Sequence, residues 1–170
     1  MNDKAQIHTL EGLFAATLMV LTVMLITRSS LIITPQSELS MDVQLKQTAE
    51  DALAILDMAP GTALQFNLTE LVAGGNMTEA TPQDNSLKPL DTEIDTQLND
   101  IMYNVDLAYV ENDTLTVKHA IIHGAPVENS VVATRPVTLY NSTVTQAGGA
   151  WNVSSNDVKV VEVRLIAWRV

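Results

Sequence analysis

A long apolar segment near the N-terminus, from Gln6 to Ile33, constrains the fold of this chain more than any other feature. Between Leu10 and Thr27 it carries a single charged residue, Glu11. An α-helix rises about 1.5 Å per residue, so a segment of this length just crosses a bilayer core of about 30 Å. The sequence therefore predicts a transmembrane helix over residues 6–33, with the rest of the chain outside it.

The carboxylate of Glu11 is unusual in such a segment. An unpaired ionised side chain in lipid costs roughly 2.5 kcal/mol or more, so it commonly marks a function and a partner. We therefore expect Glu11 to pair with a group on another molecule.

The residues from Lys4 to Glu11, KAQIHTLE, lead directly into the apolar segment. This arrangement resembles the class III signal peptides of archaeal type IV pilins and pilin-like proteins. The resemblance implies that prepilin peptidase removes a leader, residues 1–5, by cutting between Ala5 and Gln6. It also implies that Glu11 neutralises the N-terminal amine of a neighbouring subunit in a filament. Glu11 would then be sixth in the mature chain, whereas the commoner fifth place would require a cut after Gln6.

Two other interpretations of the N-terminus compete with this one. An ordinary secretory signal peptide has a positively charged start and a small-x-small cleavage site. Here Lys4 is opposed by Asp3, and no such site follows the segment. An uncut signal anchor, a single-pass helix that stays on the protein, is the other interpretation.

A second stretch, VVATRPVTLY at 131–140, is similar to a segment of haloarchaeal pilin-like proteins.

The composition limits the classes of partner. The chain has 170 residues and a formal net charge of -11, which would repel nucleic acid phosphates. It has no cysteine, so disulfides, thiolate metal sites and cysteine nucleophiles are excluded. The residues outside the apolar segment suffice for one domain of ordinary size.

A second helix is predicted over residues 36–59, after a kink or short break at Pro35, and Ser37 or Ser40 is the expected N-cap. Together the two helices would form an N-terminal unit of residues 6–60, followed by a head domain of residues 61–170. Apolar residues recur at helical spacing along one face of the second helix, which we expect to cover the head. They are Met41, Leu45, Ala49, Ala52, Leu53 and Leu56.

The hydrophobic period changes from helical to alternating beyond Met102. The alternation predicts a hairpin over 103–121, a third strand over 130–140 and a last strand over 157–169. Pro136 favours an edge position or a bulge for the third strand. The last strand is apolar on both faces, which favours a central strand or one covered on both sides. The predicted fold class is α+β, with a long hydrophobic N-terminal helix and an antiparallel sheet.

Candidate chemistry is sparse. His119 and His123 are spaced H-x-x-x-H, but on a strand they lie too far apart to share an ion. The acidic residues Asp84, Asp91, Glu93 and Asp95 match no calcium-loop spacing. No nucleophile or phosphate-binding motif is present. We therefore expect no metal, no cofactor and no enzymatic activity.

Several asparagines fit the N-x-[ST] acceptor pattern for glycosylation, and all of them follow the N-terminal helices. This distribution agrees with a translocated, exposed head. The candidates are Asn67, Asn76, Asn112, Asn141 and Asn152.

These observations predict a structural subunit, either a major or a minor pilin, of an archaeal type IV pilus-like filament. Its expected partners are other pilin subunits, prepilin peptidase and, before assembly, the membrane. The expected location is the cell surface. The alternative is a single-pass, membrane-anchored and glycosylated surface binding module.

Overall fold

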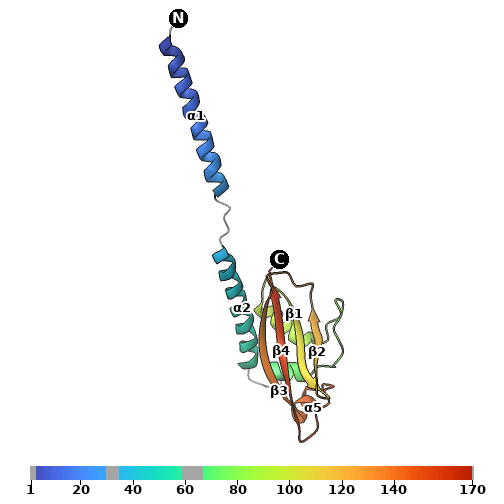
Figure 1. Cartoon of the computed structure of the whole chain (residues 1–170). Helices are drawn as coiled ribbons and strands as arrows, with labels where there is room; N and C mark the ends of the chain where they lie inside the picture. The colour runs from blue at the N-terminus through green and yellow to red at the C-terminus, as the bar shows by residue number, and fades with distance from the viewer. Residues whose placement is uncertain (1–2, 30–34, 59–66, 170) are drawn as a thin grey trace. The chain divides into compact units, whose positions relative to one another are not determined.

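The computed structural model describes residues 3–29, 35–58 and 67–169. The chain divides into two compact units, residues 1–39 and 40–170 (Figure 1). The second unit holds the sheet, most of helix α2 and the shorter helices, whereas the first holds helix α1.

Helix α1 runs from Asp3 to Ser29. None of the helices in the described part of the chain is both long and apolar enough to cross a membrane. This finding corrects the predicted fold class: the prediction of an N-terminal helix long and apolar enough to form a transmembrane segment at 6–33 was wrong. The physical reason is that charges interrupt the segment, since the uncharged stretch between Glu11 and Arg28 is shorter than the about 20 residues that a span needs.

Helix α2 runs from Pro35 to Met58. Proline suits the first helical position, where its missing N–H would be unpaired in any case. The helix therefore begins before Ser37 and Ser40, and the prediction that one of these serines caps it was wrong. The predicted break before Pro35 falls on residues 30–34, outside the described residues.

One face of α2 carries the predicted apolar stripe. Leu45, Ala49 and Leu53 are buried in the core of the second unit, together with Ala52 and Leu56. Met41, at the start of the stripe, is half exposed. The opposite face is polar, and there Lys46 and Glu50 form an exposed ion pair at 3.9 Å.

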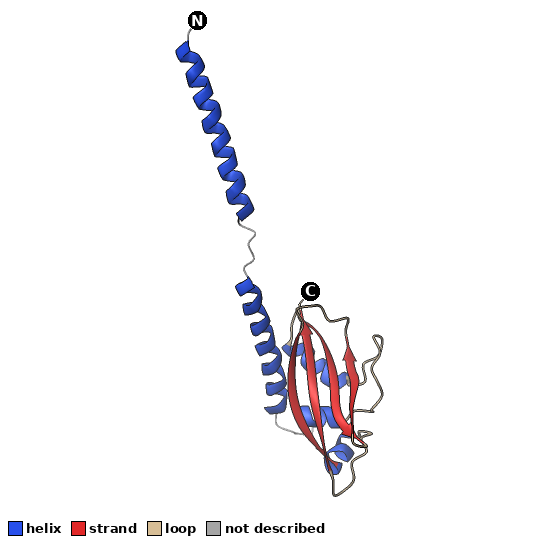
Figure 2. Cartoon of the chain, in the orientation of Figure 1, coloured by secondary structure: helices blue, strands red, loops and turns tan. Residues whose placement is uncertain are grey.

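The sheet, whose strands are red in Figure 2 and labelled in Figure 1, has four antiparallel strands in the order β2-β1-β4-β3. Their bounds are β1 Met102–Glu111, β2 Thr114–Ile122, β3 Val131–Tyr140 and β4 Val158–Trp168. The predicted α+β class and antiparallel sheet are confirmed. So are the β1–β2 hairpin, the central position of β4 and the edge position of the strand that contains Pro136.

Among the described residues of the second unit there are three further, short helices: α3 Leu68–Ala73, α4 Lys88–Gln97 and α5 Asn141–Ala147. Helix α4 begins with Pro89 in its first turn and ends before β1 begins. Helix α5 was not predicted. It ends at Gly148, whose positive φ of 71° is a backbone conformation that glycine adopts without strain.

A single hydrophobic core joins the sheet to the helices of this unit. Tyr103, Val105 and Leu107 of β1 point into it, as do Val161, Val163 and Leu165 of β4. Leu90 and Ile94 of α4 are fully buried in the same core. This packing fixes α4 against the end of the β1–β2 hairpin, where the polar cluster described below is found.

Candidate functional site

A β-bulge in β2 decides where the two histidines of the H-x-x-x-H pattern point. Val105 of β1 pairs with Ile121, but the next residue, Asp106, pairs with His119, so Ala120 is an extra residue in β2. Side chains on a regular strand alternate between faces, and residues four apart therefore share a face. The extra residue breaks this alternation, so that His119 lies on the outer face beside Asp106, whereas His123 lies on the face that α4 covers.

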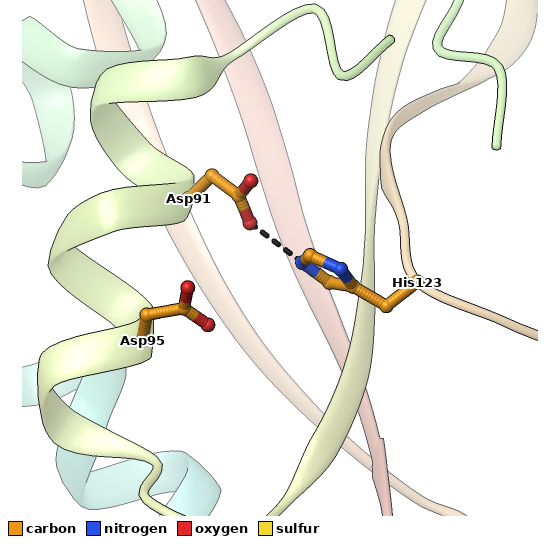
Figure 3. Close-up of side chains that lie close together, drawn as sticks. All are labelled: Asp91, Asp95 and His123. Carbon is orange, nitrogen blue, oxygen red and sulfur yellow. Dashed lines mark hydrogen bonds and ion pairs between the residues drawn. The ribbon is translucent and has the colours of Figure 1, made fainter. Parts of the chain in front are cut away.

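The imidazole of His123 lies close to two carboxylates of α4, those of Asp91 and Asp95 (Figure 3). Its Nε2 atom lies 2.7 Å from Oδ1 of Asp91. Asp95 follows Asp91 by one helical turn, so both carboxylates project from the same side of α4. One ligand atom from each of the three side chains lies within 4.8 Å of the others. We call this group the Asp91–Asp95–His123 cluster.

The hydroxyl of Tyr103 lies beneath the cluster. It is 2.8 Å from Oδ1 of Asp91, 2.8 Å from Oδ1 of Asp95 and 3.0 Å from the backbone oxygen of Asp91. The hydroxyl has one proton and can donate fully to only one of these three acceptors at a time. Burial raises the pKa of Tyr103 above its ordinary value, and the hydrogen bonds to Asp91 and Asp95 raise that pKa further.

Other side chains hold the cluster in place. The Nδ2 atom of Asn85 donates a hydrogen bond to Oδ2 of Asp91 at 2.9 Å. The backbone N–H of His123 donates to Oδ1 of Asn104 at 2.9 Å. The rings of Tyr103 and His123 pack edge to face, with their centroids 4.7 Å apart. The cluster is therefore ordered by contacts from α4, β1 and the segment before α4.

Asp91, Asp95 and His123 were each considered in the sequence, but their spatial proximity was not predicted. Of the other residues considered with them, Asp84 forms an ion pair with Lys88 at 2.9 Å, and His119 lies 2.6 Å from Asp106 on the opposite face of the sheet. The i, i+4 spacing of Asp91 and Asp95 was a usable signal. No sequence signal indicated the bulge that directs His123 toward them.

The residues that the pilin resemblance singled out lie in α1. Ala5 and Gln6, on either side of the predicted cleavage point, fall within the bounds of the helix. The Glu11 carboxylate is 70% exposed and lies 3.3 Å from Nδ1 of His8, one turn earlier. An intermolecular partner for Glu11 and a cleavage site at Ala5 stay predictions.

The glycosylation candidates differ in the exposure of their side chains. The side-chain oxygen of Asn67 accepts a hydrogen bond from the backbone N–H of Glu70 and caps α3, so its side chain is half buried. Asn76, Asn112, Asn141 and Asn152 are exposed. Modification of any of them stays a prediction.

Comparison with known proteins places the chain in a family. A family model matches residues 4–167, nearly the whole length. The chain belongs to the family of unknown function DUF7288. The DUF7288 chain is also 29% identical over 171 residues to an uncharacterized protein of Archaeoglobus fulgidus, and the alignment covers 99% of this chain and 94% of that protein. No solved structure matches the DUF7288 chain.

These comparisons correct the description of the N-terminus as that of a type IV pilin. The matching family has no assigned function and the archaeal relative is uncharacterized, so neither supports a type IV pilin with a class III signal peptide. The transmembrane helix that such a signal precedes is not found in the described part of the DUF7288 chain.

Proposed function

We propose that this chain is a structural subunit of a surface filament, assembled through its N-terminal helix. The observation that supports the proposal is the exposure of large apolar side chains along α1. Their exposed fractions range from 52% to 73% in the isolated chain. They are Leu13, Phe14, Leu18, Met19, Val20, Leu21 and Leu25.

These side chains surround α1 and do not form a single stripe. Leu18, Met19, Val20 and Leu21 follow one another, and four consecutive helical residues point in four directions about 100° apart. A helix that is apolar on every side is stable only when it is surrounded. One partner helix would cover one side, whereas a filament core places neighbouring copies around each helix.

The free energy available from such packing is large. Burying one Leu, Val, Phe or Met side chain contributes about 1.5 to 3 kcal/mol relative to exposure in water. The seven side chains between Leu13 and Leu25 named above could therefore hold subunits together without covalent links. The charge of the chain, -11, opposes association, but salt screens this repulsion at separations beyond about 8 Å.

Glu11 supplies specificity in this proposal. Its exposed carboxylate can leave its weak contact with His8 and pair with the N-terminal amine of a neighbouring subunit. Between packed helices the pair would be shielded from water, and removing one partner of a buried pair is strongly destabilising, by about 3 to 5 kcal/mol. Glu11 would thus fix how far one α1 helix slides along the next.

The test is polymerisation of the full chain, followed by sedimentation and electron microscopy. We expect filaments from the unaltered chain and monomers from a Leu18→Glu, Leu25→Glu double variant. The matched control is Leu115→Glu on β2, because Leu115 is also an apolar side chain, 63% exposed, but lies in the other unit. A monomeric unaltered chain at every concentration would overturn the proposal, as would equal loss of filaments in the control.

A further inference from the structure

We propose that the Asp91–Asp95–His123 cluster binds one divalent transition-metal ion, of the class of Zn²⁺ or Mn²⁺. The site is separate from α1, so this proposal does not depend on filament assembly. The ion would tie α4 to the residue that follows β2.

The geometry of the cluster is close to that of a metal site. Nitrogen and oxygen ligands lie about 2.0 to 2.2 Å from such an ion, which separates neighbouring ligand atoms by about 3 to 3.5 Å. His123 Nε2 and Asp91 Oδ1 are 2.7 Å apart, and no pair in the set exceeds 4.8 Å. Asp95 is exposed, so a rotation of its side chain can close the remaining gap without disturbing the core.

The donor set selects the class of ion. Imidazole nitrogen binds Zn²⁺ and other first-row transition metals, whereas Ca²⁺ and Mg²⁺ prefer oxygen ligands alone. Three protein ligands also leave at least one coordination position for water or another group. A mixed set of two carboxylates and one imidazole therefore favours Zn²⁺ or Mn²⁺ over Ca²⁺.

The charges of the cluster favour a cation as well. Asp91 and Asp95 both direct an oxygen at the Tyr103 hydroxyl, whose single proton can serve only one of them. A divalent ion between the carboxylates would offset their mutual repulsion. It would also take the place of the hydrogen between His123 and Asp91, because coordination uses the lone pair of Nε2.

A supporting set of contacts already exists around the ligands. Asn85 holds the second oxygen of Asp91, Asn104 holds the backbone of His123, and the Tyr103 ring packs against the imidazole. Metal ligands in proteins are commonly oriented by such outer hydrogen bonds, and losing one typically weakens binding about 10- to 100-fold. The cluster is therefore ordered before any ion arrives.

The test uses the full chain after treatment with a chelator. Equilibrium dialysis against Zn²⁺ and, separately, Mn²⁺, followed by elemental analysis, should give one ion per chain. His123→Ala and Asp95→Asn should each weaken binding by more than about 100-fold, and Asn85→Ala by about 10- to 100-fold. Saturating Zn²⁺ should raise the midpoint of thermal unfolding of the unaltered chain, and of neither ligand variant.

His119→Ala is the matched control. His119 is also an exposed histidine beside an aspartate, at 2.6 Å from Asp106, but it lies on the other face of the sheet. Its loss should leave the affinity unchanged, and unfolding curves of all variants without metal show whether each is folded. The proposal is overturned if the unaltered chain takes up no stoichiometric ion at millimolar Zn²⁺ or Mn²⁺. Binding that His119→Ala reduces as much as His123→Ala would overturn it as well.

Discussion

Helices α1 and α2 use their apolar residues in opposite ways. In α2 the apolar residues form one stripe, and most of them are buried in the core that the sheet shares with α3 and α4. In α1 the large apolar side chains point in all directions and are exposed in the isolated chain. The charged side chains of Lys46 and Glu50 in α2 lie outside its stripe and are exposed, whereas α1 has no charged residue between Leu13 and Leu25.

The difference shows which part of the molecule buries its apolar side chains within a single chain. A helix with one apolar face needs one surface to cover it, and the sheet supplies that surface to α2. A helix that is apolar on all sides needs several neighbours. The unit of residues 40–170 can therefore fold as a single chain, whereas the large apolar side chains of α1 remain exposed in the isolated chain, and the proposed filament would cover them.

Two truncations provide the sharpest test of this contrast. A chain of residues 35–170, which lacks α1, should remain folded and become monomeric. A chain of residues 59–170 loses α2 and with it Leu45, Leu53 and Leu56, at about 2 to 5 kcal/mol for each leucine. That loss is comparable with the whole stability of a domain, about 5 to 15 kcal/mol, so this chain should not fold. Circular dichroism and analytical ultracentrifugation distinguish the outcomes, and cooperative unfolding of the shorter chain would contradict the role given to α2.

A pair of leucine substitutions tests the same contrast at single residues. Leu53→Ala, in the buried stripe of α2, should lower the free energy of unfolding by about 2 to 5 kcal/mol. Leu18→Ala, on α1, should change the unfolding of the head by less than about 0.5 kcal/mol, because Leu18 is exposed. Urea unfolding, monitored by the fluorescence of Trp151 and Trp168, measures both. Equal effects would mean that Leu18 is part of the same core.

Tyr103 links the core to the Asp91–Asp95–His123 cluster, and its raised pKa makes the stability of the head depend on pH in the alkaline range. Tyr103→Phe should lower stability by about 1 kcal/mol, because it removes the donor to Asp91 and Asp95. The folded state raises the pKa of Tyr103 above the unfolded value of about 10, so it binds the phenolic proton more tightly than the unfolded state does.

The stabilisation from this proton is complete below pH about 10 and falls as the pH rises above it. Unfolding curves of the unaltered chain between pH 9 and 11, in the presence of a chelator, should show this decline, and Tyr103→Phe should show a weaker one. An identical decline in both chains would assign the effect to another group.

The ion pair between α2 and β3 should have the smallest effect. Arg135 donates two hydrogen bonds to Oδ2 of Asp57, at 2.9 and 2.7 Å, but both side chains are about one-third exposed. Solvent screens such pairs, so Asp57→Asn should lower the free energy of unfolding by about 0.5 kcal/mol. Thermal unfolding at low and high salt checks this value. A loss above about 2 kcal/mol would show that the pair anchors α2 more strongly than its exposure implies.

Much of the head could be predicted because its signals are local. Alternation located the strands, the missing N–H of Pro136 placed β3 at the edge, and the apolar residues on both faces of β4 placed that strand in the centre. Helix α5 was missed because residues 141–147 have little apolar periodicity and only Val144 is buried.

The polar cluster could not be predicted because it depends on long-range register. Asp91 and His123 are 32 residues apart, and one extra residue in β2 decides that they meet. The apolar character of residues 6–33 was recognised, but its length as a membrane span was overestimated, because Glu11 and Arg28 limit the uncharged stretch.

The edges of the sheet limit how copies of this chain can join. On one side β3 carries Pro136, which interrupts its row of donors. On the other side, N–H groups of Ala80 and Ser86 already bond to carbonyls of His119 and Ala120 in β2. Each border is therefore interrupted along part of its length, which disfavours growth by continuous cross-chain β-pairing, the geometry of amyloid. If the proposed filament crowds the heads of neighbouring copies, these interruptions would oppose the joining of their sheets edge to edge.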